Sequence, residues 1–477
     1  MLVELTITGV ILIPAVWMAI TRSSRLIEYA IIVVAFNRGL RRVVDYYVNE
    51  QFNPRSLISL TPLLVGMLLL IPAFQHRHRL GAAGQRVLML LGAAIGLGLL
   101  IGLVINRLAA VYSLAEWLAA IAAIAFTATQ PASQREADRW IKTAGWAAIG
   151  VALYGWWQYY TIPPWDAMWL EQSGMQGYMG QPIPTQMTLF STMNERGPCA
   201  ALLAWAAIPM VLSRRWRNFT GWVAVALLVA TIFLTGTRTM FVVMAIVCVM
   251  YPLLTKGKGV VSILLFTVGA VFALDFLIAK IPGTERFAER YSADSLHGES
   301  SSLRGRLEIY QSGAFMILRN PLGFGLGSSG MGKRVESDSV EGVGDSGYIQ
   351  IFAQFGWLGG LLFFGALWKI WRELGERWEV GAKMMGHRRV DGTIPAARAI
   401  LIASLALLLV NDFYAGFSII WIFFGRALAI DNDPRLQAPP LAAQGAASVI
   451  RRNAAHRVSG RREKANGHRV HAWRRPI

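Results

Sequence analysis

The sequence predicts an all-α integral membrane protein: a polytopic bundle of about twelve transmembrane helices with one long loop that contains helices of its own. Hydrophobic residues make up 55% of the 477 residues and charged residues only 16%, below the roughly 25% of a typical soluble domain. Apolar runs of about 17–25 residues, enough to cross a bilayer, recur along the chain. They are interrupted by one polar insert, residues 281–347. We expect it to carry the chemistry, because long loops in compact proteins are commonly functional.

Twelve apolar runs are candidate membrane spans. They are Leu2–Ile20, Leu57–Phe74, Val87–Ile105, Ala109–Thr127, Ala144–Tyr160, Pro198–Leu212, Phe219–Leu234, Met240–Leu254, Val260–Ala279, Tyr348–Trp368, Ala396–Val410 and Phe413–Ala429. A further run, Leu26–Phe36, is shorter and indicates either a short span or an interfacial segment. The side of the membrane that holds the N-terminus therefore stays open.

Basic residues concentrate in alternate connections. The basic connections are His76–Arg86, Arg135–Lys142, Arg214–Arg217, Lys256–Lys258 and Lys369–Arg398, and the tail 431–477 is basic as well. The positive-inside rule then places these connections and the C-terminus in the cytoplasm and the insert outside. The sequence thus divides into a transmembrane domain, residues 1–430, and a basic tail that we expect to be disordered and drawn to anionic headgroups.

Three arginines near the N-terminus do not follow the charge pattern. Arg38, Arg41 and Arg42 stand between the first apolar runs, where either topology leaves them unexplained. An amphipathic interfacial helix from Arg38 to Val48 would accommodate them.

Several function classes are disfavoured. The net charge of +18 comes mainly from the basic connections and tail, and no nucleic-acid motif accompanies it, so we expect no nucleic-acid partner. Cys199 and Cys248 lie in apolar runs and are expected to be small core residues, not a disulfide or a metal pair. The segments predicted outside hold no His or Cys pair at metal spacing, so neither a metal nor a cofactor is expected.

Arg238 is the first candidate for a functional side chain. It follows a Thr-Gly-Thr turn and opens an apolar run on the side predicted to be outside. A charge at that position is costly unless it is paired or hydrated, which makes it a candidate by default. A guanidinium suits bidentate binding of a diphosphate. The alternative is an arginine that extends to the outer headgroups.

The segment 161–196, also predicted outside, holds the next candidates. Asn194 and Glu195 end it and offer polar groups for substrate binding. Its aromatic residues, Trp165, Trp169 and Tyr178, indicate an interfacial belt or, alternatively, platforms for sugar stacking.

Within the insert, residues 301–318 are predicted to form a helix at the membrane surface that ends at Asn320. Arg304 and Glu308 stand four residues apart and can form a surface pair, although Arg304 also remains a substrate-binding candidate. Arg306 lies off that pair and could point into a pocket. His297 stands in a polar stretch and is expected to be solvated.

The insert ends at a carboxylate beside the next apolar run. Asp345 precedes Tyr348 by three residues, and the run begins at Tyr348. Asp345 can cap that helix, since a negative charge is stabilised near a helix N-terminus. It can also serve as a general base that takes a proton from a sugar hydroxyl. Tyr348 is a further substrate-binding candidate.

Together these features resemble the O-antigen ligase and O-antigen polymerase superfamily of bacterial envelope proteins, over roughly residues 144–429. The resemblance is carried by Asn194 in Ser-Thr-Met-Asn-Glu-Arg-Gly-Pro, Thr-Gly-Thr-Arg238, Arg306 ahead of Asn-Pro-Leu-Gly-Phe-Gly, and Gly-Asp345-Ser-Gly-Tyr348 followed by Ile-Gln-Ile-Phe-Ala-Gln-Phe-Gly-Trp-Leu-Gly-Gly. It implies a metal-independent membrane glycosyltransferase of the bacterial inner membrane. The implied donor is an undecaprenyl-diphosphate-linked glycan, used at the periplasmic face.

The resemblance also implies roles for particular residues. Arg238 and Arg306 would hold the diphosphate, and in the ligases a loop histidine is thought to activate the acceptor. Here Asp345-Ser346 replaces the ligase-type His-Asn, which favours a polymerase of exopolysaccharide or O-antigen repeat units. The alternatives are a ligase that transfers glycan to a lipid A core or another acceptor, and a polysaccharide transporter or flippase. A chain-length regulator or export complex is a possible partner of the polymerase.

Overall fold

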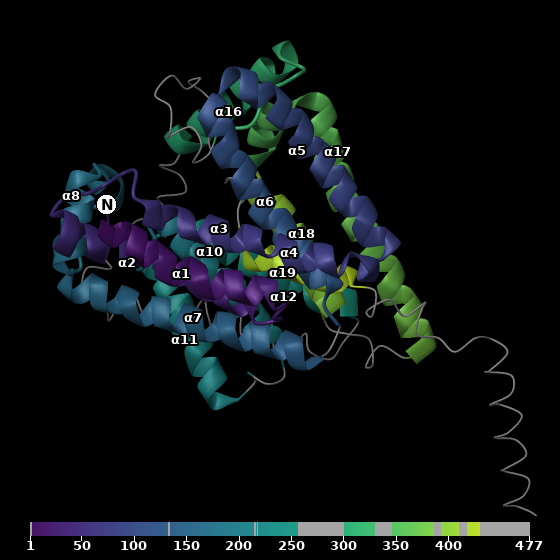
Figure 1. Ribbon diagram of the computed structural model, residues 1–477, viewed down its shortest axis with the longest axis horizontal. Coiled ribbons are helices and arrows are strands. Elements are labelled where there is room, and N and C mark those ends of the chain that lie inside the picture. Colours follow the sequence, from purple (N-terminus) through teal and green to yellow (C-terminus); the bar gives the residue numbers. More distant parts are fainter. Residues whose placement is uncertain are drawn as a thin grey trace, which may run out of the picture.

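The computed structural model describes residues 2–131, 134–213, 216, 218–255, 300–329, 346–385, 393–409 and 417–429; residues 300–306 are described only along the backbone. Every regular element in this part of the chain is a helix (Figure 1), as the sequence predicts. The candidate span Val260–Ala279, most of the insert, His297, Asp345 and the tail lie outside the described residues.

The described helices follow the apolar runs of the sequence. They are α1 (Leu2–Ile20), α2 (Leu26–Val44), η1 (Asp45–Asn49), η2 (Leu57–Leu60), α3 (Thr61–Leu68), α4 (Leu70–Gln75), η3 (Arg77–Arg79), α5 (Ala82–Ile105), α6 (Arg107–Thr129), α7 (Gln134–Thr161), α8 (Pro164–Gln172), α9 (Gln176–Met179), α10 (Arg196–Leu212), α11 (Phe219–Leu234), α12 (Arg238–Thr255), α16 (Ser300–Arg319), α17 (Gly347–Met385), α18 (Thr393–Leu407) and α19 (Ile419–Leu428). Residues 301–318 are helical as expected, and α16 ends just before Asn320.

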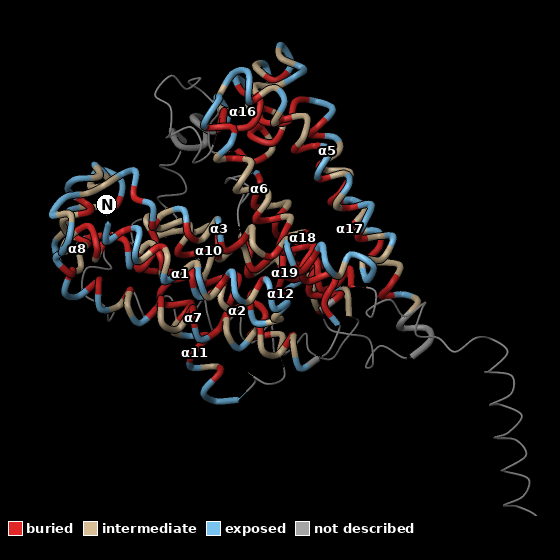
Figure 2. The backbone as a smooth tube through the Cα atoms, viewed as in Figure 1, coloured by how far each residue is buried: buried red, intermediate tan, exposed pale blue. Residues whose placement is uncertain are grey.

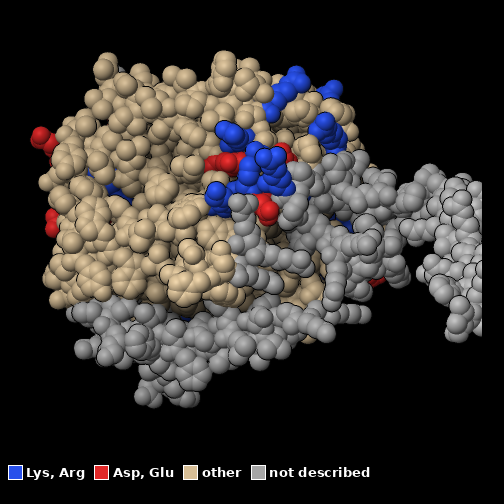
Figure 3. All heavy atoms as spheres, turned by 90° about the horizontal axis from the view of Figure 1, so that it is seen from below, with Lys and Arg blue, Asp and Glu red and all other residues tan. Residues whose placement is uncertain are grey.

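Among the described residues, six helical stretches are long and apolar enough to cross a membrane. They are Leu2–Ile20, Leu57–Gln75, Ala82–Ile105, Arg107–Thr129, Arg238–Thr255 and Gly347–Val380. Four shorter apolar helices accompany them: Arg196–Leu212, Phe219–Leu234, Ile394–Leu407 and Ile419–Leu428. The membrane helix bundle is therefore confirmed, while the number of twelve spans stays a prediction. Figure 3 shows broad uncharged surface on one face of the molecule, as lipid contact requires.

The helices alternate in direction, so their connections gather at two ends of the bundle. We call the end that holds residues 45–56, 161–195 and 320–329 the insert end, and the end that holds residues 21–25 and 76–81 the basic end. At the insert end the carboxylate of Glu4 accepts hydrogen bonds from Asn49 (2.8 Å) and Asn53 (3.0 Å). At the basic end Arg426 Nη1 donates to Pro131 O over 2.8 Å. Helix α1 therefore begins at the insert end.

The prediction of an interfacial helix from Arg38 to Val48 is wrong. Helix α2 is continuous from Leu26 to Val44, and it returns beside α1 through the bundle. The side chains of Arg41 and Arg42 are buried in it, at 5% and 0% exposure. Their charges do not reach the headgroups, because acidic partners inside the protein neutralise them.

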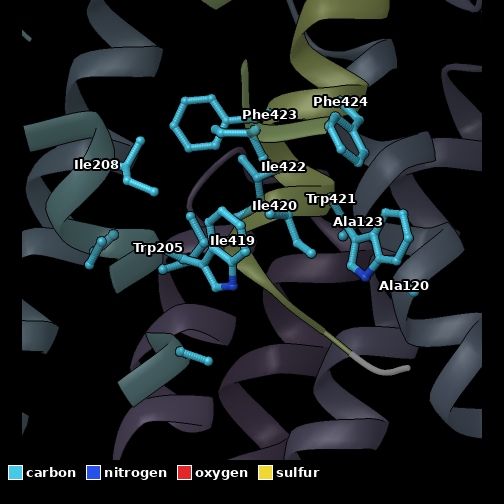
Figure 4. Close-up of a cluster of buried hydrophobic side chains, with 14 of the residues drawn as sticks. Ala120, Ala123, Trp205, Ile208, Ile419, Ile420, Trp421, Ile422, Phe423 and Phe424 are labelled. Atoms are coloured by element: carbon cyan, nitrogen blue, oxygen red, sulfur yellow. The ribbon is translucent and has the colours of Figure 1, made fainter. Parts of the chain in front are cut away.

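Buried residues lie mainly in the interior of the bundle, where the helices pack together (Figure 2). Figure 4 shows one such crossing: the aromatic and branched side chains of α19 lie between α6 and α10, with Trp421 close to Ala120 and Ala123. Helix α19 approaches α6 so closely that a Cβ added to Gly425 would lie 2.0 Å from Thr127 Oγ1. Small residues allow such close helix packing in membranes.

The turn 320–329 is fitted into a break of helix α17. At Gly356 (φ +69°) the backbone of α17 is not helical. Phe324 N–H donates to Ala353 O over 2.6 Å, and Trp357 N–H donates to Pro321 O over 2.8 Å. The break at Gly356 leaves backbone N–H and C=O groups of α17 without partners in the helix, and the turn forms hydrogen bonds with them. These bonds attach the described part of the insert to the bundle.

Helix α5 receives the other side of this turn. Leu326 N–H donates to Gly98 O over 2.8 Å, and a Cβ added to Gly102 would lie 2.5 Å from Leu326 O. We therefore expect Gly102→Ala to displace the turn and to lower the free energy of unfolding by about 1–3 kcal/mol, as overpacking does. Gly96→Ala is the matched control on the same helix, since no atom lies within 4 Å of a Cβ at Gly96. Thermal unfolding in detergent measures the stability of both variants. Equal stabilities would contradict the close packing of the turn 320–329 against Gly102.

Candidate functional site

Several of the described helices begin at the insert end, and three of them start beside the candidate residues. Helix α10 starts at Arg196, α12 at Arg238 and α17 at Gly347. Helix α18 ends at the same place and packs against both α12 and α17, and Gly347 N–H donates to Leu408 O over 2.9 Å. The positive ends of three helix dipoles and two guanidinium groups thus share one end of the bundle, an arrangement that attracts anions.

The segment 189–195 enters the bundle beside these helix starts. Leu189 N–H donates to Leu234 O over 3.0 Å, and Leu234 lies two residues before Gly236 in the turn that leads to α12. Thr192 Oγ1 donates to Ala35 O of α2 over 2.6 Å. The segment is therefore tied on one side to α11 and on the other to α2, and it leads directly into Asn194, Glu195 and α10.

Arg42 holds this segment from within α2. Its guanidinium donates to the carbonyl oxygens of Ser191 and Met193. Its Nε lies 2.7 Å from Asp166 Oδ1, and both side chains are fully buried. The ring of Phe190 lies 5.0 Å from the guanidinium carbon. Such an ion pair persists in the interior only when its remaining donors and acceptors are also satisfied.

Asp166, at the start of α8, links Arg42 to helix α7 through hydrogen bonds. Asp166 Oδ2 accepts hydrogen bonds from Tyr154 OH (2.8 Å) and Gln158 Nε2 (2.6 Å) of α7. Gln158 Oε1 in turn accepts from Ser191 N–H over 2.7 Å. Four parts of the chain, α2, α7, α8 and segment 189–195, thus meet in one buried polar cluster, which sequence reasoning missed.

A second buried pair lies next to the first, because Arg41 directly precedes Arg42 in α2. Arg41 Nε lies 3.3 Å from Asp45 Oδ2, and Asn49 Nδ2 donates to Asp45 Oδ1 over 2.9 Å. Burial raises the pKa of the Asp45 carboxyl, while the hydrogen bond from Asn49 and the charge of Arg41 act in the opposite direction. The pair fixes the connection 45–56 against the end of α2.

The predicted residues Asn194 and Glu195 lie half-buried at the start of α10. Asn194 Oδ1, Arg196 Nη1 and Thr237 Oγ1 are all buried, and within the described ranges none of these three atoms has a hydrogen-bond partner. Unsatisfied buried polar atoms are uncommon and call for a physical reason. These unsatisfied atoms lie at the starts of α10 and α12, close to the predicted residues.

Arg238 occupies the first position of α12 and is half-buried. The structure thus brings Asn194, Glu195 and Arg238 to the same end of the bundle. Tyr348 lies at that end too, but its hydroxyl donates to Leu405 O over 2.9 Å and its ring stacks on Phe364. The side chains of Arg304 and Arg306, and all of Asp345, lie outside the described part.

The aromatic residues of segment 161–196 have three different environments. Trp169 is buried at 4% exposure and packs against Phe190, so it is neither a belt residue nor an open stacking platform. Trp165 Nε1 donates to Tyr154 OH over 2.7 Å. Tyr178 is half exposed, and the Arg196 guanidinium lies 4.1 Å from its ring centre. Tyr178 therefore remains a candidate for sugar stacking.

In the part of the chain that the structure describes, no group of three or more His, Cys, Asp and Glu side chains is arranged to hold a metal ion. Cys199 and Cys248 are both buried, and they form no disulfide with each other.

Comparison with known proteins bears on this end of the bundle. No curated protein and no solved structure matches the chain. Residues 223–364 match the family model described as O-Antigen ligase, and this range contains Arg238, the insert and the first half of α17. Residues 223–364 are therefore similar to the O-antigen ligase family, and this match supports the resemblance of the motifs to the O-antigen ligase and polymerase superfamily.

Proposed function

We propose that this protein is a membrane glycosyltransferase that joins undecaprenyl-diphosphate-linked oligosaccharide repeat units into exopolysaccharide or O-antigen. The reaction would take place at the periplasmic face of the inner membrane, with the tail in the cytoplasm. The observation that carries the proposal is the gathering of Arg196, Arg238 and three helix N-termini at the insert end, inside a chain whose residues 223–364 match O-antigen ligases.

The chemistry needs little from the protein beyond charge and position. A hydroxyl oxygen of the acceptor sugar attacks the anomeric carbon of the donor, and the bond from that carbon to the diphosphate oxygen breaks. The bonding electrons leave with the diphosphate, which cationic groups and helix dipoles stabilise. Arg238 and Arg306 would supply that stabilisation, and Arg304, Asn194, Glu195 and Tyr348 would position the sugars.

The acceptor hydroxyl also loses its proton, which a base must take. We assign this role to Asp345, because it replaces the histidine expected in a ligase and stands beside the start of α17. No metal takes part in this scheme. A chain-length regulator or an export complex would receive the product.

The ligase remains the second candidate, since the matching family model is described by that activity. The two functions differ in the acceptor and therefore in the product. We expect purified protein, incubated with lipid-diphosphate oligosaccharide and EDTA, to produce a ladder of longer lipid-linked chains on a gel. A single product that forms only when lipid A core is added would instead identify a ligase, and the absence of any transfer with either acceptor would refute both.

A further inference from the structure

The face of helix α6 that is directed toward α19 is apolar near the basic end and polar toward the insert end. Near the basic end this face carries Ala120, Ala123 and Thr127, which pack against α19 (Figure 4). At helical spacing toward the insert end, the same face carries Glu116 and Ser113. The two helices run in the same direction, and Gly425 lies against Thr127, so Glu116 falls beyond the first residue of α19. An apolar packing face thus becomes polar where α19 has not yet begun.

Glu116 is an ionisable residue in the middle of a membrane-spanning helix. It is enclosed by neighbouring helices but keeps accessible surface. The cation that acts on it is Arg38 of α2, which is also half-buried. The two side chains form no direct ion pair, and within the described ranges neither has a hydrogen-bond partner. Charged residues inside a membrane protein are costly and usually mark a functional pathway.

Helix α3 separates these two charges. On one side Thr61 Oγ1 donates to Asn37 Oδ1, next to Arg38, over 2.7 Å. On the other side Gly66 faces α6, where a Cβ on Gly66 would lie 2.9 Å from Ala119 Cβ. Helix α3 therefore packs against both α2, which carries Arg38, and α6, which carries Glu116.

Two neighbours connect this place to the proposed transfer site. Ser113, one turn from Glu116, is buried at 2% exposure, and its Oγ has no hydrogen-bond partner in the described part of the chain. Arg38 precedes Gly39, where an added Cβ would lie 3.3 Å from Thr192 Cβ. Thr192 belongs to the segment that leads to Asn194. Arg38 therefore lies beside the segment that leads to the candidate site.

The hydrogen-bond donors and acceptors of Arg38, Ser113 and Glu116 indicate which class of ligand they can bind. A guanidinium only donates hydrogen bonds, a carboxylate only accepts them, and a serine hydroxyl does both. A ligand that satisfies all three must donate and accept, as the hydroxyl groups of a carbohydrate do. A phosphate would be repelled by Glu116, and an alkyl chain would leave the polar groups unsatisfied.

We propose that Arg38, Ser113 and Glu116 form a carbohydrate subsite inside the bundle, which binds hydroxyl groups of the glycan separately from its diphosphate. The subsite extends the proposed function, on which it rests. It orients the sugar by hydrogen bonds, so its loss weakens binding of the glycan more than it slows the transfer of a bound one.

Steady-state transfer assays of the full chain test the subsite, with lipid-diphosphate glycan extracted from the producing cells as substrate. Glu116→Ala is expected to raise KM roughly tenfold, the size of a lost charge-assisted hydrogen bond, with kcat changed less than about threefold. Glu116→Gln, which keeps an acceptor oxygen, recovers part of the affinity, and Ser113→Ala has a smaller effect. Glu376→Ala, in an exposed pair with Arg372, is the matched control.

Other results would overturn the subsite. A fall in kcat with unchanged KM would make Glu116 part of the chemistry instead of a sugar contact. Full recovery of activity in the exchanged pair Arg38→Glu with Glu116→Arg would make the two residues a structural ion pair. Unchanged kinetics in Glu116→Ala would remove any role in binding.

A second measurement is independent of turnover. Saturation-transfer NMR with the free repeat-unit oligosaccharide, which lacks the diphosphate and the lipid, is expected to show a signal that Glu116→Ala removes and Arg238→Ala leaves intact. If wild-type protein transfers no glycan but this signal behaves as expected, the proposed function fails and the subsite stands. If transfer occurs and the signal does not depend on Glu116, only the subsite fails.

Discussion

Replacing Arg238 by alanine is expected to abolish polymer while lipid-linked single repeat units still appear in the membrane. Arg238 opens α12 at the insert end, where the starts of α10 and α17 also lie. Removing a preorganised group that stabilises developing charge typically costs about 10²–10³-fold in rate, enough to erase a ladder on a gel. Arg238→Lys keeps the charge but loses the bidentate geometry, so we expect partial activity.

The matched control for Arg238 is Arg55→Ala. Arg55 is an exposed arginine at the same end of the bundle, so a general loss of positive charge there would affect both variants equally. Polysaccharide gels and extraction of lipid-linked repeat units, with protein amounts normalised by immunoblot, give the readout. Normal polymer from Arg238→Ala would refute the assignment of Arg238 to the diphosphate.

Replacing Arg42 by alanine is expected to cause the largest loss of stability. The substitution leaves Asp166 buried without its counter-ion and frees the carbonyl oxygens of Ser191 and Met193. Breaking a buried pair by removing one partner costs about 3–5 kcal/mol. Activity should fall as well, because segment 189–195 is no longer held beside α12. Thermal unfolding in detergent measures the first effect.

Two further variants distinguish the effect of an unpaired charge at Arg42 and Asp166 from the effect of lost packing. Replacing both partners by apolar residues of similar size, Arg42→Met with Asp166→Leu, is expected to recover much of the stability, since no uncompensated charge remains. Arg372→Ala removes one partner of an exposed pair (66% and 43% exposure) and should cost less than about 1 kcal/mol. An Arg42→Ala protein as stable as the Arg372→Ala protein would contradict the structural role.

The helices were predictable because their lengths and apolar faces are set by local sequence. The runs Leu2–Ile20 and Phe219–Leu234 match α1 and α11 at both ends. In a membrane the backbone must satisfy its own hydrogen bonds, so an apolar run of sufficient length has few options besides a helix. The sequence did not predict where helices continue into polar residues. Helix α2 continues through Arg38, Arg41 and Arg42, and α7 begins ten residues before Ala144.

The candidate site was only partly predictable. Arg238 was found because a charge at the start of an apolar run is conspicuous in sequence alone. The Arg42–Asp166 pair was not, since the partners stand far apart in the chain and the charge rule treats each arginine as a surface residue. Glu116 carried a usable signal, a single acidic residue within a predicted span, but no sequence pattern indicates that the charge of Arg38 acts on it.

The buried carboxylate of Glu4 has a consequence for handling the protein. It accepts hydrogen bonds from Asn49, Asn53 and the Leu57 backbone, all at the insert end. Whichever compartment contains the insert also receives any tag or reporter fused ahead of Leu2. A fusion at that position must therefore be translocated if the insert is periplasmic, and it must be chosen to fold and report there.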